Sequence, residues 1–179
     1  LFHRATVMLA RVHEVTGGGL PAKPYGRIAV AVAPSNSNVV YAFIEGVKGA
    51  LFRSDDGGKT WDRRDDSQMM VWRPFYFANL IVDPANADRV FKTNLGLIQS
   101  LDGGKTFAGT GGAHADFHDV WIDPADPKNV IAGDDGGIWY SKDGAETWWK
   151  GNNLPISQFY HVSVDNQDPY QVFGGLQDN

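Results

Sequence analysis

The sequence predicts an all-β fold built from repeated four-stranded antiparallel sheets, the blades of a β-propeller. Three observations support this class. One octapeptide recurs three times, a proline-containing turn recurs in the same register, and no stretch of about 12 residues shows helical periodicity. Glycine accounts for 21 of the 179 residues, well above the usual share of roughly 7%, as expected for a chain rich in tight turns.

The octapeptide has the pattern Ser-x-Asp-x-Gly-x-Thr-aromatic, with Ala145 replacing glycine in the third copy. Its Ser and Asp side chains can accept hydrogen bonds from nearby backbone N–H groups, and glycine supplies positive φ, so each copy closes a hairpin turn. The Thr and the aromatic residue start the next strand, and we expect the aromatic ring to be buried between blades. The structural residues are Ser54, Asp56, Gly58, Thr60, Trp61, Ser100, Asp102, Gly104, Thr106, Phe107, Ser141, Asp143, Thr147 and Trp148.

Each repeat reads as four short strands. The first strand ends in a proline turn, seen at Pro34, Pro84 and Pro124 and more loosely at Pro169, and an apolar strand follows each turn. A unit of roughly 40 to 50 residues with four strands is typical of a propeller blade. In the third unit the predicted strands are 118–123, 129–133, 137–140 and 147–150.

The whole chain is expected to be one propeller segment of about four blade units. Two readings of this segment remain open: an arc of a larger propeller, which we favour, and a closed ring of four blades. An open arc exposes two blade faces, so we expect the rest of a longer chain or a partner subunit to cover them. The predicted units are a partial blade (1–25), three blades (26–66, 76–110 and 116–152) and a second partial blade (156–179).

Composition excludes several classes of protein. The formal net charge is −5, so we expect no nucleic-acid partner. No apolar run reaches the roughly 18 residues of a membrane span. The chain has no cysteine, which excludes disulfides and thiolate metal sites.

The octapeptide resembles the Asp box, also called the bacterial neuraminidase repeat. This resemblance implies a propeller in which the box lies at the periphery, on the turn between the third and fourth strands. Three longer runs, 26–34, 114–124 and 153–162, are similar to a large family of secreted bacterial Asp-box proteins described as sortilin-like or as "glycosyl hydrolase" repeats. The resemblance implies a secreted protein, either extracellular or periplasmic.

Polar residues near the starts of the first strands are the candidate site. Alternation in an extended segment would put His114, Asp116 and His118 on one face, where they form a weak candidate for a divalent metal. The alternative is a set of cross-blade hydrogen bonds, and no cofactor is the preferred expectation. Aligning the first strands gives the ligand-binding candidates Arg27, Arg73, Tyr76, His118, Gln158 and His161.

Two further segments keep two interpretations each. The run 134–137 pairs acidic residues with glycines, which predicts a hairpin turn and, as the alternative, a Ca²⁺ site. The aromatic-rich run 69–77 is either a contact between blades or a ligand platform.

Three functions fit these patterns. A binding scaffold for a glycan, a peptide or a partner protein comes first. A glycoside hydrolase of the xyloglucanase type comes second, with Asp116 and Asp119 as weak candidates for its two carboxylates. A sialidase is disfavoured, because the Arg-Ile-Pro signature of sialidases is absent from the sequence. A structural subunit of a larger extracellular assembly is the third reading.

Overall fold

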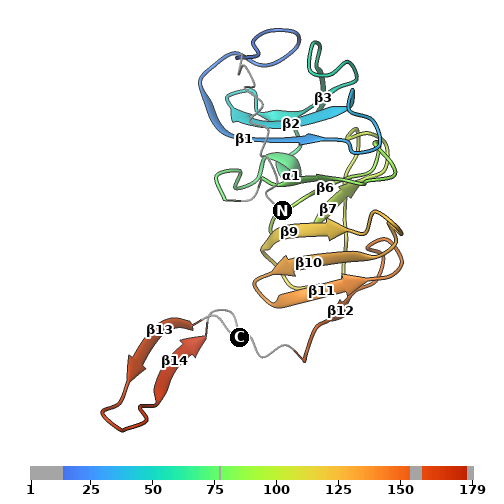
Figure 1. The fold of residues 1–179 in the computed structure, drawn as a ribbon. Coiled ribbons are helices and arrows are strands. Elements are labelled where there is room, and N and C mark those ends of the chain that lie inside the picture. The colour runs from blue at the N-terminus through green and yellow to red at the C-terminus, as the bar shows by residue number, and fades with distance from the viewer. Residues whose placement is uncertain (1–13, 77, 154–158, 177–179) are drawn as a thin grey trace, which may run out of the picture.

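The computed structural model describes residues 14–76, 78–153 and 159–176, and it consists mainly of three four-stranded antiparallel sheets stacked face to face (Figure 1). In each sheet the strands follow one another in chain order. The first sheet contains β1 (Tyr25–Val32), β2 (Val40–Gly46), β3 (Ala50–Ser54) and β4 (Asp62–Asp65). The second contains β5 (Leu80–Val82), β6 (Val90–Lys92), β7 (Ile98–Ser100) and β8 (Ala108–Gly109). The third contains β9 (Phe117–Ile122), β10 (Val130–Asp134), β11 (Gly137–Ser141) and β12 (Trp149–Lys150).

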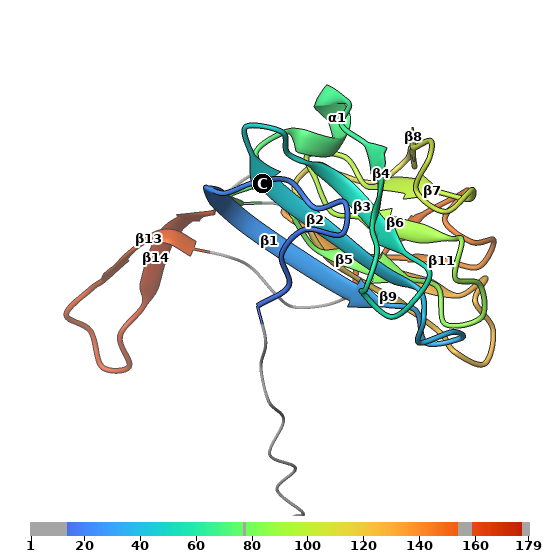
Figure 2. The same cartoon turned by 90° about the horizontal axis from the view of Figure 1, so that it is seen from above.

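Two elements lie outside these sheets. A hairpin of β13 (Phe159–Val164) and β14 (Val172–Leu176) stands away from the stack, as both views show (Figures 1 and 2). A single helical turn, α1 (Gln68–Val71), connects the first sheet to the second. The sequence did not predict α1, because a helix of 4 residues is too short to show helical periodicity. Ser67 caps it by accepting a hydrogen bond from Met70 N. None of the helices in the described part of the chain is long and apolar enough to cross a membrane.

Apolar side chains fill the space between neighbouring sheets. The first and second sheets share one cluster, which includes Tyr41, Leu51 and Val90. The second and third share another, which includes Phe91 and Val130. Because side chains alternate along a strand, the middle sheet contributes one face to each cluster, so the sheets stack as blades do.

The three octapeptides form the same hydrogen-bonded turn. In the first copy Ser54 Oγ donates to Asp56 Oδ1 over 2.7 Å, and Asp56 Oδ1 also accepts from the backbone N–H groups of Lys59 and Thr60, at 2.9 Å each. Hydrogen bonds from the Thr147 hydroxyl and N–H, then from Ser141, lower the pKa of the equivalent Asp143 to about 2.

These bonds explain one difference from the predicted strand bounds. The fourth strand of the third sheet begins at Trp149 and not at Thr147, because Asp143 holds Thr147 in the turn. The aromatic residues that end the octapeptides are partly buried. Phe107 packs on the cluster between the first two sheets, Trp148 on the cluster between the second and third, and Trp61 on the outer face of the first sheet.

Candidate functional site

The strand connections separate two ends of the stack. The octapeptides and the proline turns lie at one end, because both follow strands that run in the same direction. The opposite end carries the starts of the first strands and the turns between second and third strands, such as Asp134–Gly137. Most of the polar residues predicted as a site belong to this second end.

Four side chains make a continuous series of contacts there. His118 Nε2 lies 2.7 Å from Asp135 Oδ1. The Tyr76 ring meets the His118 ring edge to face, with 5.7 Å between centroids. The guanidinium carbon of Arg73 lies 5.8 Å from the centroid of the Tyr76 ring, within cation–π range. The series, which we call the polar cluster, therefore joins the segment before the second sheet to the third sheet.

The polar cluster is held by backbone contacts to neighbouring elements. Asn79 Nδ2 donates to the His118 carbonyl over 2.8 Å, which ties the second sheet to β9. Asn94 Nδ2 donates to the Met69 carbonyl over 2.6 Å and fixes α1 against the turn after β6. Met70 is fully buried, whereas Trp72, Phe75 and Tyr76 are exposed, so the aromatic-rich run contributes both to the core and to the surface.

Two non-glycine residues with positive φ lie in or near the polar cluster. Among the described non-glycine residues only Arg73, Asp116 and Ala145 have positive φ, at 43°, 63° and 74°. Ala145 occupies the glycine position of the third octapeptide. The repeat gives no such explanation for Arg73 and Asp116. A non-glycine residue held at positive φ costs about 1–3 kcal/mol, and such residues concentrate at functional sites.

Two carboxylates near the start of β9 contain buried oxygens with no hydrogen-bond partner among the described residues, Asp116 Oδ1 and Asp134 Oδ2. The other oxygen of Asp134 accepts from the Trp139 indole N–H over 2.8 Å and from Gly136 N over 2.9 Å. Burial raises the pKa of Asp134 above its usual range. Asp134 is therefore held within the turn by its own neighbours.

The predicted metal trio does not share one face of a strand. β9 begins only at Phe117, and the positive φ of Asp116 breaks the extended run before it, so the alternation argument fails for His114 and Asp116. His114 Nδ1 lies 3.2 Å from the Ala115 carbonyl. No group of three or more His, Asp or Glu side chains in the described ranges is placed to hold a metal ion.

The remaining predicted residues are scattered. The backbone N–H of Arg27 donates to Glu45 Oε2 over 2.7 Å, on the first sheet. Asp119 is exposed and accepts from its neighbour Val120 N. His161 lies on the separate hairpin, and Gln158 falls outside the described residues.

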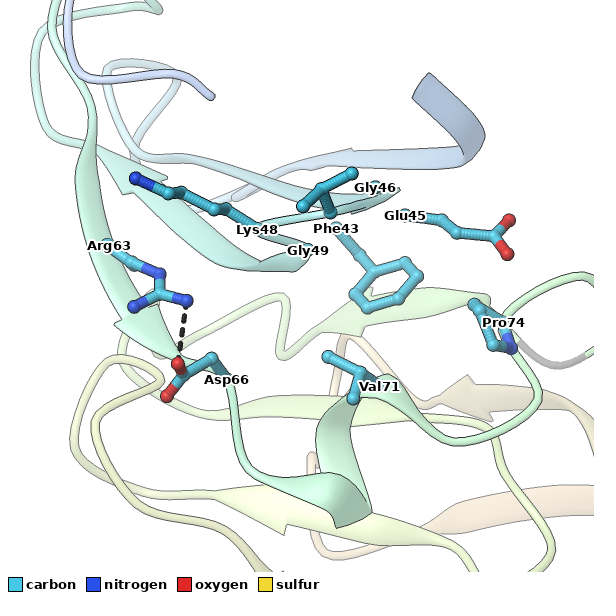
Figure 3. A pocket seen from close by; sticks show the side chains of 10 residues that line it. Phe43, Glu45, Gly46, Lys48, Gly49, Arg63, Asp66, Val71 and Pro74 are labelled. Atoms are coloured by element: carbon cyan, nitrogen blue, oxygen red, sulfur yellow. Dashed lines mark ion pairs between the residues drawn. The ribbon is translucent and has the colours of Figure 1, made fainter. Parts of the chain in front are cut away.

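A pocket of about 450 Å³ lies between the β2–β3 turn and α1 (Figure 3). Phe43, Val71 and Pro74 give it an apolar side, and Arg63 pairs with Asp66 over 2.6 Å at the other. Since Pro74 directly follows Arg73, the pocket and the polar cluster share one segment of chain.

Sequence reasoning missed Asp135 as the partner of His118 and missed the pocket altogether. The order of the predicted strands contained a signal for Asp135. Because β9 and β10 are antiparallel, the turn after β10 lies at the same end of the sheet as the start of β9. The pocket gave no such signal, since it depends on how α1 packs against the first sheet.

No protein-family model matches this chain, and no curated protein matches it in sequence. Several solved structures match this chain in fold. A GH74 enzyme from Niastella koreensis matches with a TM-score of 0.59 and 21% identity, over 78% of this chain and 24% of that one. The GH74 xyloglucanase from Xanthomonas campestris matches with a TM-score of 0.59 and 18% identity, over 75% of this chain and 24% of that one. An ancestral GH74 enzyme matches with a TM-score of 0.54 and 18% identity, over 67% of this chain and 17% of that one.

These comparisons, with the stacked sheets, confirm the predicted fold class: all-β, with blades of the β-propeller type arranged as an open arc. The chain spans about a quarter or less of the length of the structures that it matches. At such identities the likeness concerns the fold.

Proposed function

We propose that this chain is part of a propeller scaffold that binds an extended, hydroxyl-rich ligand, such as a glycan chain, at the end of the sheets that bears the polar cluster. The observation that carries the proposal is the series Arg73–Tyr76–His118–Asp135, in which an exposed aromatic ring lies between a cation and a histidine–carboxylate pair. Aromatic faces beside a few convergent polar groups suit sugar rings, which present both C–H faces and hydroxyl groups.

The neighbouring pocket supports a ligand longer than one sugar. It adds the apolar side chains of Phe43, Val71 and Pro74 and the ionic pair Arg63–Asp66 to the same end of the stack. A chain-like ligand could occupy both places at once, and a peptide with polar side chains is the competing ligand class.

Calorimetric titration with xyloglucan oligosaccharides tests the proposal, because a xyloglucanase is among the structures of similar fold. We expect measurable binding by the unsubstituted chain and a loss of about tenfold, or about 1.4 kcal/mol, for Tyr76→Ala. The matched control is Tyr140→Ala, which removes an exposed tyrosine from the outer face of the third sheet. Equal affinity of the two variants, or absence of binding to any glycan tested, contradicts the proposal.

Glycoside hydrolysis is the second candidate, favoured by the fold similarity to GH74 enzymes and by the carboxylates at the start of β9. It requires two carboxylates about 5 to 9.5 Å apart around the bond to be cleaved. Release of reducing ends from xyloglucan separates the two functions. If the chain cleaves xyloglucan, and Asp116→Asn or Asp119→Asn abolishes cleavage while binding persists, the scaffold is catalytic.

We also propose that the protein works outside the cytoplasm, in keeping with the resemblance to secreted Asp-box proteins. Detection of the full-length protein in the culture medium or the periplasmic fraction supports this placement, whereas detection only in the cytosol contradicts it.

A further inference from the structure

The outer face of the third sheet is apolar and uncovered. Strand register places Trp121, Ile131, Tyr140 and Trp149 in one row across the four strands. Their exposed fractions are 53%, 42%, 40% and 45%. Tyr140 and Trp149 stack with 5.6 Å between ring centroids. A contiguous exposed apolar row of this kind marks a contact surface.

The two preceding sheets identify what covers this row. Ile131 follows Val130 at the start of β10, as Tyr41 follows Val40 in β2 and Phe91 follows Val90 in β6. Tyr41 and Phe91 are 0% exposed, because the next sheet packs on them. Ile131 therefore occupies the position at which each earlier sheet receives its successor.

The separate hairpin carries the opposite half of such an interface. Val164 pairs with Val172 across β13 and β14, as Ile122 pairs with Val130 in the third sheet and Val82 with Val90 in the second. In the two sheets these residues are buried against the preceding sheet. In the hairpin Val164 and Val172 are 59% and 50% exposed, and they share their face with Val162.

We propose that the outer face of the third sheet is a docking surface whose occupant is the hairpin β13–β14 of the same chain. Docked there, the hairpin forms the first two strands of a fourth sheet and covers Trp121 and Ile131, while the free edge of β14 accepts a third strand by backbone pairing. Docking also brings His161 to the end of the stack that carries Asp119.

The absence of cysteine from the chain permits a direct test. Phe91 and Val130 lie in one buried cluster, so the equivalent pair, Ile131 and Val172, comes together when the hairpin docks. The double variant Ile131→Cys with Val172→Cys is expected to form an intramolecular disulfide under mild oxidation. In the matched control, Ile131→Cys with Phe173→Cys, the second cysteine points to the other face of β14, because it neighbours Val172 in the strand.

Non-reducing peptide mapping by mass spectrometry measures both products. Cross-linking of the Val172 variant at least about tenfold faster than the control supports docking. Equal rates overturn the proposal. A product that links two chains also overturns it, since the occupant is then a second copy.

A second measurement does not depend on cysteine chemistry. Hydrogen exchange of the β13 and β14 amides is compared between the unsubstituted chain and Ile131→Asp, which places a charge on the exposed face. Docking predicts faster exchange in the hairpin of the variant, with exchange in the first two sheets unchanged. Unchanged exchange in the hairpin argues against docking.

Discussion

Lys92 is a charged residue where the neighbouring sheets have alanine. Lys92 of β6 pairs with Ile98 of β7 as Ala42 pairs with Phe52 and Ala132 with Trp139. The side chain is fully buried, its Nζ donates to the Thr93 carbonyl over 3.3 Å, and it lies 5.0 Å from the centroid of the Phe43 ring. Burial lowers the pKa of Lys92 to about 8.

This shift predicts a pH-dependent stability. Between pH 8 and the ordinary lysine value of 10.5 the unfolded chain binds the proton more tightly than the folded chain. The free energy of unfolding therefore rises with pH in this range, by up to about 3 kcal/mol. Lys92→Met should abolish the rise. Urea unfolding from pH 7 to about 9.5, below the tyrosine range, measures it. Lys105→Met, at an exposed position, is the control, and a rise that persists in Lys92→Met contradicts the assignment.

At the scale of elements, Arg89 ties the turn after β5 to the third sheet. Its Nη1 donates to Asp83 Oδ2 over 2.9 Å and to the Pro127 carbonyl over 3.1 Å, and its Nη2 donates to the Gly144 carbonyl over 2.6 Å. The side chains of Arg89 and Asp83 are 11% and 3% exposed. One guanidinium thus joins the second sheet to a proline turn and an octapeptide of the third.

Removal of this guanidinium should weaken the contact between the two sheets. Arg89→Ala leaves the Asp83 carboxylate buried and unpaired, so we expect a loss of about 3–5 kcal/mol in the free energy of unfolding. Arg63→Ala, which breaks an exposed pair with Asp66, should cost no more than about 1 kcal/mol. Denaturant unfolding compares them, and similar losses in the two variants would refute the role given to Arg89.

The sequence predicted local elements better than contacts between elements. The strand ends near the octapeptides follow from a few neighbouring residues. Ser54 and Asp56, for example, each accept a hydrogen bond from a backbone N–H group four positions further along the chain. The polar cluster depends on how the segment before β5 packs on the third sheet. Tyr76 and His118 were each predicted as site residues, but their ring contact and the pairing of His118 with Asp135 required the three-dimensional stack.

At the scale of the whole molecule, substitutions at equivalent positions of different sheets should lower the free energy of unfolding by different amounts, according to what packs on each side chain. Phe91→Ala removes a ring from the cluster between the second and third sheets, with an expected loss of about 3–5 kcal/mol. Ile131→Ala, at the equivalent position of the third sheet, should cost less, about 2 kcal/mol, because its proposed cover is a hairpin of two strands and not a full sheet. Thermal and urea unfolding compare the two, and no loss in Ile131→Ala would contradict a covered outer face.

The octapeptide turns and the polar cluster lie at opposite ends of the stack, and this separation affects how such a chain can diversify. Substitutions around Tyr76 or Asp135 leave the hydrogen bonds of Asp56, Asp102 and Asp143 untouched. Substitutions that alter the proposed ligand contacts can therefore accumulate at one end while the hydrogen bonds that close the octapeptide turns stay intact at the other.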